Sequence, residues 1–280
     1  MSLANQTCWV VGGVGVIGRG ITRGLLKAGA TVIVNSRSED RLTRFSKDLG
    51  HPERLITING SLLPGYASKT VCQTLAAMSL NHVVAHGAVR YWGDFGTIDR
   101  RDESHMIQKR QGGSFLQSMT PEDFVASASQ LASLHYSAAQ QLIPRIQFSN
   151  GPSSYTFVTG DAGGHPQGKR SALGEINNAH IWGLAAALRN ERFEKDVNCR
   201  EIRVRLPVNR TVEERETEPR ATPLSEDIGT LCAGLAANAS AMDERGALVE
   251  VADQASLEAL LSRYGTDLSG DDDVDVAQQA

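Results

Sequence analysis

The chain has 280 residues, of which 41% are hydrophobic, and its formal net charge is −4 at pH 7. This length and hydrophobic share suit one large α/β domain, whereas the negative charge and the dispersed Lys and Arg residues argue against a nucleic-acid partner. No apolar run approaches the ~18 residues of a membrane span, and the four cysteines form no CxxC pair, so we expect a cytoplasmic protein with reduced thiols.

Short apolar runs alternate with amphipathic segments along the first part of the chain. Such runs are typical of buried parallel strands, and we predict strands at Thr7–Val11, Thr31–Val34, Leu55–Ile58 and His82–Ala85. The segments between them predict helices after Gly18, over Glu39–Leu49 and over Ala67–Met78. This alternation predicts a Rossmann-type, doubly wound parallel sheet with helices on both faces.

An inserted segment, residues 89–119, lacks clear periodicity. Loops of this length are uncommon in compact domains, so we interpret the segment as a lid or binding loop, with a plain surface insertion as the alternative. A helix is predicted over Thr120–Ile143, with Thr120 as its cap and Pro144 as its end.

The rest of the chain continues the alternation of strands and helices. Strands are predicted at Tyr155–Thr159, Ile202–Leu206 and Ala247–Val251, and helices at Glu175–Arg192, Ser225–Asn238 and Ala255–Tyr264. Residues 265–280 are acidic, contain few large apolar side chains and predict a disordered tail. We therefore expect a single domain over residues 1–264 with a sheet of about seven strands.

A glycine-rich loop lies between the first predicted strand and the first predicted helix. It reads GGVGVIG and contains Gly13-x-Gly15-x-x-Gly18, the dinucleotide fingerprint. The three glycines allow a tight turn, close approach to a pyrophosphate and close packing of the helix, whose N-terminus adds amide donors and positive potential. We predict cofactor contacts from Gly12, Gly13, Gly15, Ile17 and Gly18.

The second predicted strand runs into Asn35-Ser36-Arg37, the place where the ribose of a dinucleotide is recognised. An Asp or Glu there would hold the 2′-hydroxyl of NAD(H) and repel a 2′-phosphate. A serine beside an arginine binds that phosphate, because the guanidinium makes a charge-assisted contact. The sequence therefore favours NADP(H), with an ordinary surface arginine as the alternative reading of Arg37.

The glycine loop resembles that of the short-chain dehydrogenase/reductase family. Gly12, Ile17 and Gly18 match the family's TGxxxGIG pattern, whereas Val11 and Val16 replace its Thr and its middle Gly. The resemblance spans most of the chain and implies the fold of that family and its mode of cofactor binding.

Further family positions follow the later strands. Ala85-His86-Gly87-Ala88 takes the place of the family's NNAG, and Pro207-Val208 that of its Pro-Gly. His86 is either a proton carrier near the ribose or a hydrogen-bonded structural residue. The predicted cofactor contacts therefore also include Gly60, Ser61, His86, Gly87, Ala88, Thr159, Asn178 and Pro207.

The family's catalytic Asn, Ser, Tyr and Lys are all missing. Counted from Pro144 and from the VTG at the end of the fifth predicted strand, their places hold Leu131, Asp161, Gly174 and Asn178. No tyrosine lies between positions 155 and 264, so no shift of the following helix restores Tyr-x-x-x-Lys. The resemblance thus implies a divergent member that lacks the usual proton donor.

Asp161 is the first catalytic candidate. A carboxylate beside the nicotinamide would stabilise a cationic substrate such as an iminium ion, which accepts a hydride without a proton donor. If burial raises its pKa, Asp161 would instead act as an acid, and a strand-end cap is its structural alternative. His165 is the second candidate, with a solvated surface position as its alternative.

These features favour an NADPH-dependent oxidoreductase that reduces an imine, an iminium or an activated alkene in secondary metabolism. The alternatives are a non-catalytic NADP(H)-binding sensor or complex subunit, and a cyclase or isomerase without net redox chemistry. We expect a small-molecule substrate, no metal, and a dimer or tetramer that pairs, as in the family, through the helices at Thr120–Ile143 and Glu175–Arg192.

Overall fold

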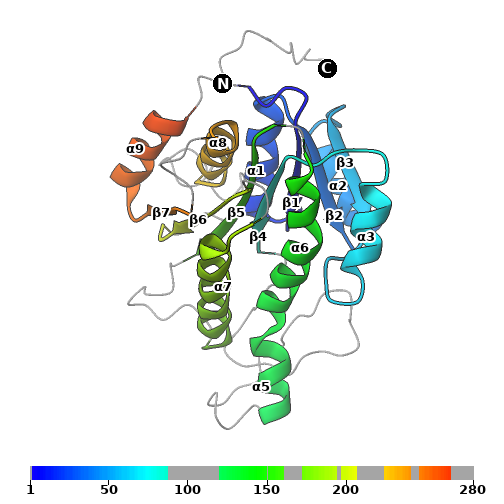
Figure 1. Ribbon diagram of the computed structural model, residues 1–280, viewed down its shortest axis with the longest axis vertical. Coiled ribbons are helices and arrows are strands. Elements are labelled where there is room, and N and C mark those ends of the chain that lie inside the picture. Colours follow the sequence, from blue (N-terminus) through cyan, green and yellow to red (C-terminus); the bar gives the residue numbers. More distant parts are fainter. Residues whose placement is uncertain are drawn as a thin grey trace, which may run out of the picture.

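A computed structural model describes residues 2–87, 120–149, 151–160, 172–193, 197–206, 224–240 and 246–265, which are built around one sheet (Figure 1). Within these residues the strand order is β3-β2-β1-β4-β5-β6-β7. The strands are β1 (Thr7–Val11), β2 (Thr31–Ser36), β3 (Leu55–Asn59), β4 (His82–His86), β5 (Ser153–Gly160), β6 (Val197–Val204) and β7 (Leu248–Val251). Every neighbouring pair is parallel, which confirms the predicted Rossmann-type sheet of about seven strands.

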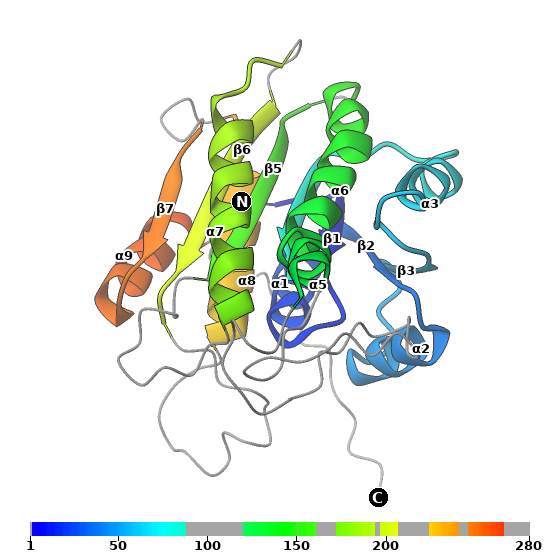
Figure 2. The same ribbon diagram turned by 90° about the horizontal axis from the view of Figure 1, so that it is seen from below.

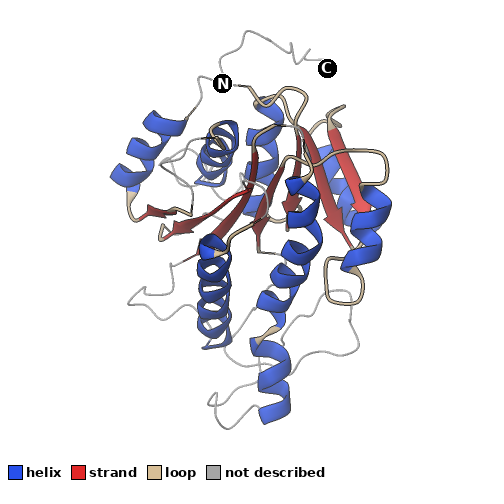
Figure 3. Ribbon diagram, in the orientation of Figure 1, coloured by secondary structure: helices blue, strands red, loops and turns tan. Residues whose placement is uncertain are grey.

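Helices cover both faces of the sheet (Figures 2 and 3). One face packs against α1 (Val16–Lys27), α2 (Glu39–Asp48), α8 (Leu224–Ala237) and α9 (Gln254–Tyr264). The other face packs against α3 (Ala67–Thr74), α6 (Gln130–Gln147) and α7 (Ala172–Asn190), and α5 (Pro121–Ala128) directly precedes α6. Alternate residues of each central strand enter the two cores, so Val10 faces α1 while Trp9 faces α3 and α6.

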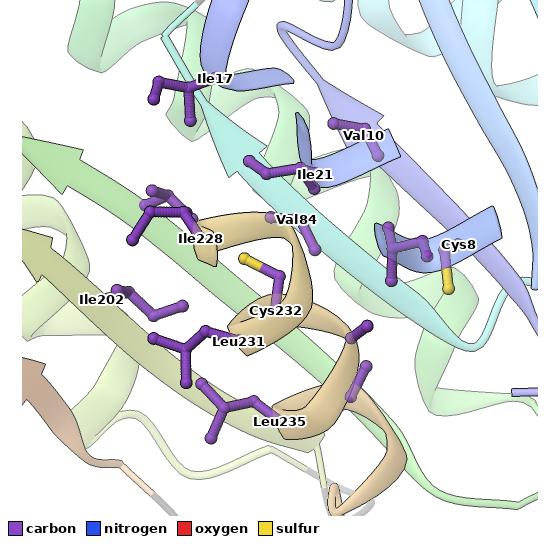
Figure 4. Packing of buried hydrophobic residues seen from close by; sticks show 14 of the residues in the cluster. Cys8, Val10, Ile17, Ile21, Val84, Ile202, Ile228, Leu231, Cys232 and Leu235 are labelled. Carbon is purple, nitrogen blue, oxygen red and sulfur yellow. The ribbon is translucent and has the colours of Figure 1, made fainter. Parts of the chain in front are cut away.

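The close approach of α1 to α8 fixes the helix that follows the glycine loop. A Cβ atom on Gly20 would lie 1.9 Å from the Ser225 carbonyl oxygen, and one on Gly229 would lie 2.0 Å from that of Gly20. The two backbones therefore touch where no side chain intervenes. Figure 4 shows Leu231 and Cys232 of α8 packed in the same apolar cluster, which buries this helix pair against the sheet.

Two features of the central helices differ from the sequence prediction. The helix expected over Thr120–Ile143 is broken at Ser129 into α5 and α6. Pro144 does not end it, because α6 continues to Gln147 with Ile143 and Ile146 buried in the core. A proline in the last turn removes only one backbone hydrogen bond, and the burial of these two side chains outweighs that loss.

Element ends account for the remaining differences. Helix α3 ends at Thr74 rather than Met78. Strand β6 begins at Val197 and ends at Val204, whereas the prediction ran from Ile202 to Leu206. The predicted insertion and tail lie outside the described residues, apart from Gly265, so the domain division stays a prediction.

None of the helices in the described ranges is both long and apolar enough to span a membrane.

Candidate active site

The glycine loop forms a turn in which each glycine has a separate steric role. Gly12 has a φ of +77°, a conformation that residues with a side chain rarely adopt. A Cβ atom on Gly13 would lie 2.7 Å from Val34, and one on Gly18 would lie 2.4 Å from the Gly12 carbonyl oxygen. At Gly15 a Cβ atom would meet, among the described residues, only that same oxygen, at 3.4 Å. The turn thus packs tightly against β2 and α1, but remains open at Gly15.

The N-terminus of α1 presents backbone donors at this open position. Gly15 is the N-cap and provides no side-chain hydrogen bond to the first turn. The first-turn amides of a helix lack intrahelical partners and carry partial positive charge, which favours an anionic group such as a pyrophosphate. Ile17 is buried, so its side chain belongs to the core and only its backbone is available to a ligand.

The ends of β2 and β3 are fastened to each other by side chains. The Asn35 amide accepts a hydrogen bond from Trp9 Nε1 at 3.0 Å and donates one to the Gly60 carbonyl at 3.2 Å. Thr70 Oγ1 accepts from the Ser61 amide at 3.1 Å and donates to the Ser61 carbonyl at 2.9 Å. The side chain of Asn35 therefore braces the sheet edge, and the backbone after β3 has a fixed course.

The turn after β2 combines a hydroxyl group with a cation. Ser36 is buried, and its Oγ accepts the Ser38 amide at 3.2 Å. Ser38 in turn caps α2 by accepting the Arg41 amide at 3.3 Å. Arg37 lies between the two serines and is exposed. A phosphate group placed at this turn would meet a hydroxyl group and a guanidinium group together.

Two histidines flank the turn at the end of β4. His86 donates from Nδ1 to the Val158 carbonyl of β5 at 3.3 Å, and His135 of α6 donates from Nε2 to the Gly87 carbonyl at 2.9 Å. Burial lowers the pKa of each ring to about 4, although these hydrogen bonds partly oppose the shift. Both rings are therefore neutral at physiological pH, and neither serves as a proton donor of ordinary strength.

A buried ionic network ties the end of β5 to β6 and α7. The Glu201 carboxylate is 0% exposed and accepts the Thr159 hydroxyl at 2.7 Å. It also pairs with Arg203 at 2.9 Å and with Arg189 of α7 at 3.7 Å. The Arg203 guanidinium lies 5.0 Å from the centre of the Trp182 ring. This network fixes Thr159, which is two residues before Asp161.

The break between α5 and α6 is bridged by α7. The Asn177 side chain accepts the Leu131 amide at 3.4 Å, and His180 donates from Nδ1 to the Ala128 carbonyl at 2.6 Å. Leu131 itself is buried. That Leu131 takes the place of the family's catalytic asparagine stays a prediction from the sequence.

Most of the predicted cofactor residues gather at one edge of the sheet. The carboxyl ends of parallel strands share an edge, and the order reverses between β1 and β4, which is where α/β sheets bind dinucleotides. Residues at or just after these strand ends are Gly12, Gly13, Gly15, Gly18, Asn35, Ser36, Arg37, Gly60, Ser61, His86, Gly87 and Thr159. Asn178 is half-buried on α7. Ala88, Asp161, His165 and Pro207 lie outside the described residues.

Sequence reasoning missed three groups near this edge. His135 lies on the apolar face of an amphipathic helix, where a polar side chain signals a specific hydrogen bond. Glu201 lies in a buried strand, and a charge there signals an ion pair. Asn177 has no comparable signal in the sequence.

No group of three or more potential metal ligands occurs among the residues that the structure describes.

Comparison with protein families gives one partial match. A family model described as "NADP oxidoreductase coenzyme F420-dependent" matches residues 9–78, which contain the glycine turn and the ends of β2 and β3. A comparison with curated protein sequences finds no significant match.

Solved structures share the fold along most of the chain. The Pseudomonas aeruginosa RhlG/NADP active-site complex matches with a TM-score of 0.65 and 20% identity, covering 89% of this chain and 96% of that one. A 3-ketoacyl-(acyl-carrier-protein) reductase from Brucella melitensis complexed with NADH matches with a TM-score of 0.60 and 17% identity, covering 89% and 98%. A short-chain dehydrogenase/reductase described as a glucose/ribitol dehydrogenase, also from Brucella melitensis, gives 0.63 and 17%, covering 89% and 95%.

Proposed function

We propose that this protein, which has the fold of the short-chain dehydrogenases/reductases, is an NADP(H)-dependent oxidoreductase acting on a small-molecule substrate. One observation carries the proposal. The glycine turn and the uncapped N-terminus of α1 lie beside the turn at Gly87, at the point where the strand order reverses. A Cβ atom on Gly87 would meet no atom of the described residues within 4 Å, so these residues leave space at this edge.

The residues at this edge fit a dinucleotide from one end to the other. The α1 N-terminus would hold the pyrophosphate, and Ser36 and Arg37 would hold the 2′-phosphate. His86 would accept a ribose hydroxyl group at Nε2, because its Nδ1 already donates to β5. When bound, the nicotinamide supplies a hydride at C4.

Charge reversal at Arg37 tests the choice of cofactor. We expect the wild type to bind NADPH more tightly than NADH, and Arg37→Glu to weaken NADPH binding at least ~10-fold because a charge-assisted phosphate contact is lost. Titration calorimetry measures both constants. Arg54→Glu, at the opposite end of β3, is the matched control and should leave both unchanged. Equal affinity of the wild type for NADPH and NADH would contradict the assignment.

The chemistry follows from the missing proton donor. Leu131, Gly174 and Asn178 supply no acid, and the neutral His86 and His135 are weak ones. We therefore propose reduction of an imine, an iminium or an activated alkene in secondary metabolism, with Asp161 opposite the substrate cation. Hydride addition to an iminium carbon breaks the C4–H bond and the C=N π bond, whose electrons become the lone pair of the amine, so no proton is needed. A neutral imine takes a proton from solvent before the hydride arrives, and an activated alkene takes one from solvent afterwards. His165 remains a second candidate for this site.

Asp161→Asn tests the electrostatic role. Removing one aligned charge from a transition state typically costs about 10²–10³ in kcat, and we expect a loss of this size with an iminium substrate. NADPH affinity should stay within ~3-fold of wild type, because Asp161 is not assigned to the cofactor. Steady-state kinetics and a binding titration measure the two quantities. Unchanged turnover would rule out the role of Asp161.

A non-catalytic NADP(H)-binding sensor or complex subunit is the second candidate. The buried Leu131 favours it, because an apolar side chain there does no acid–base chemistry. Tight NADPH binding without turnover on any carbonyl, imine or alkene would support it. Isomerisation or cyclisation of a substrate without NADPH oxidation would instead support the third candidate, a cyclase or isomerase.

We also propose that the chain forms a homo-oligomer through α6 and α7. The outer side of α7 exposes the small residues Ala179, Gly183 and Ala187, which permit close helix packing. A cytoplasmic location likewise remains a prediction from the sequence.

A further inference from the structure

The turn after β4 is held from two sides, and one of its two anchors is a histidine that belongs to no predicted site. Gly87 has a φ of +50°, and none of the described residues occupies the place where its side chain would lie. Its carbonyl oxygen accepts the hydrogen bond from His135 Nε2 at 2.9 Å, across the gap between α6 and the end of β4. His86, the preceding residue, is bound to β5.

The hydrogen bond to Gly87 fixes the state of the His135 ring. A carbonyl oxygen accepts only from N–H, so the proton of the neutral ring is on Nε2 and Nδ1 is an acceptor. This Nδ1 atom is buried and has no hydrogen-bond partner among the described residues. Because a buried acceptor without a donor is unfavourable, apolar packing alone would favour a phenylalanine at this position.

The described residues around His135 offer its ring no second hydrogen bond, although the His86 ring is near enough to lower its pKa. The ring is 2% exposed, and its centre lies 6.2 Å from that of Phe157. The only polar contact of the side chain within the described residues is therefore the bond to Gly87. A polar residue placed in a core for a single hydrogen bond specifies one geometry, here that of the glycine carbonyl.

We propose that His135 is a positioning residue that holds the turn at Gly87 in the shape that receives the nicotinamide half of the cofactor. This inference rests on the proposed NADP(H) function, since it assigns a role within that site. His135 does not touch the cofactor or transfer a proton. It acts through the Gly87 carbonyl, and a turn that is already ordered loses less entropy when a ligand binds.

Two substitutions at His135 separate the hydrogen bond from packing. Glutamine places an N–H near the position of Nε2, whereas phenylalanine fills the space and donates nothing. We expect His135→Phe to weaken NADPH binding about tenfold and His135→Gln to stay within ~3-fold of wild type. Phe removes the unpaired Nδ1 acceptor but leaves the Gly87 carbonyl without its donor, whereas Gln keeps that bond and buries its own amide oxygen. Each variant therefore leaves one acceptor unpaired, and we expect their melting temperatures to lie close together.

A matched control lies on β4, the strand that leads to Gly87. His82 is also buried and neutral, but it lies at the opposite end of β4 and bonds to Ser154 and Gln6. His82→Phe should change the melting temperature without changing NADPH affinity. A loss of affinity in His82→Phe equal to that in His135→Phe would mean that both act through general destabilisation, which overturns the proposal.

The two hypotheses fail in different ways. A wild-type protein that does not bind NADPH refutes the proposed function. Wild-type binding with equal affinity in His135→Phe refutes the positioning role alone, as does an equal loss in the Phe and Gln variants. Hydrogen exchange of the segment 84–87, measured without cofactor, gives an independent readout. Faster exchange in the Phe variant than in wild type and Gln supports the role, and equal exchange in all three overturns it.

Discussion

Replacing Glu201 by glutamine should lower the free energy of unfolding by about 3–5 kcal/mol. The substitution keeps the shape of the side chain but removes its charge. Glu201 is 0% exposed, and the paired side chains of Arg203 and Arg189 are only 18% and 15% exposed. Both arginines would then be left largely buried without the carboxylate that compensates them, and water cannot reach them well enough to replace it.

A charge pair on the neighbouring strand supplies the control. Arg205 and Glu250 lie 2.8 Å apart but are each 46% exposed, and exposed pairs contribute about 0–1 kcal/mol. Urea unfolding of Glu201→Gln, Glu250→Gln and the wild type compares the two environments. The double variant Glu201→Gln/Arg203→Met should recover part of the loss, because one of the uncompensated cations is removed. A loss below about 1 kcal/mol for Glu201→Gln would contradict the assigned network.

The network also links stability to the site. Glu201 holds the Thr159 hydroxyl near the end of β5, and Arg189 connects the same carboxylate to α7. Asn178 lies on α7, and Asp161 is the next residue in the sequence after β5. We therefore expect Glu201→Gln to reduce turnover at temperatures where the protein is still folded, with little change in NADPH affinity.

Acid should destabilise the protein steeply below about pH 6.5, because buried histidines are neutral in the fold. Burial lowers the pKa of His82 to about 3, an effect strengthened by the nearby Arg200, and lowers that of His135 to about 4. The unfolded chain, with an ordinary histidine pKa near 6.5, binds these protons first. Each histidine therefore contributes stability that is fully present above pH 6.5 and is lost as the pH falls toward its folded pKa.

Protonation of these two histidines should cost a large part of the free energy of unfolding. Between pH 6.5 and pH 5 the two histidines together remove about 3 kcal/mol of a total that is typically 5–15 kcal/mol. His86, whose pKa is also lowered to about 4, adds to the slope. Urea unfolding at several pH values measures the slope. In the double variant His82→Gln/His135→Gln, the pH dependence of the free energy of unfolding should correspond to about two fewer protons taken up on unfolding. A wild-type free energy of unfolding that does not change between pH 6.5 and 5 would contradict the neutral, buried state.

The parts of the structure predicted from sequence are those with local causes. Gly12–Gly18 between an apolar run and an amphipathic helix predicts a strand, a turn and a helix, because the glycines and the apolar period are adjacent in the chain. The parallel order of the sheet follows from the same alternation and is confirmed. The start of β6 was missed because Asn198, Arg200 and Glu201 interrupt its apolar pattern, although all three are buried through contacts with distant elements.

The residues of the candidate site also fall into those with a local sequence signal and those without one. Residues of a continuous motif, such as Ser36 and Arg37, are visible in the sequence because their spacing to the strand end is fixed. The contact of His135 with Gly87 joins residues 48 positions apart, and that of Thr159 with Glu201 joins residues 42 apart. Neither pairing has a local signature, since each depends on how α6 and β6 pack against the sheet.

The central claim is that this site transfers a hydride from NADPH to a substrate that needs no proton from the protein. The most direct measurement uses NADPH carrying deuterium at both C4 positions, incubated with the enzyme and a cyclic iminium ion. We predict a product amine with one deuterium on the former iminium carbon, formed by the wild type and at least ~100-fold more slowly by Asp161→Asn. NADPH bound in the site with no deuterium transferred to any iminium, imine or activated alkene would contradict the claim.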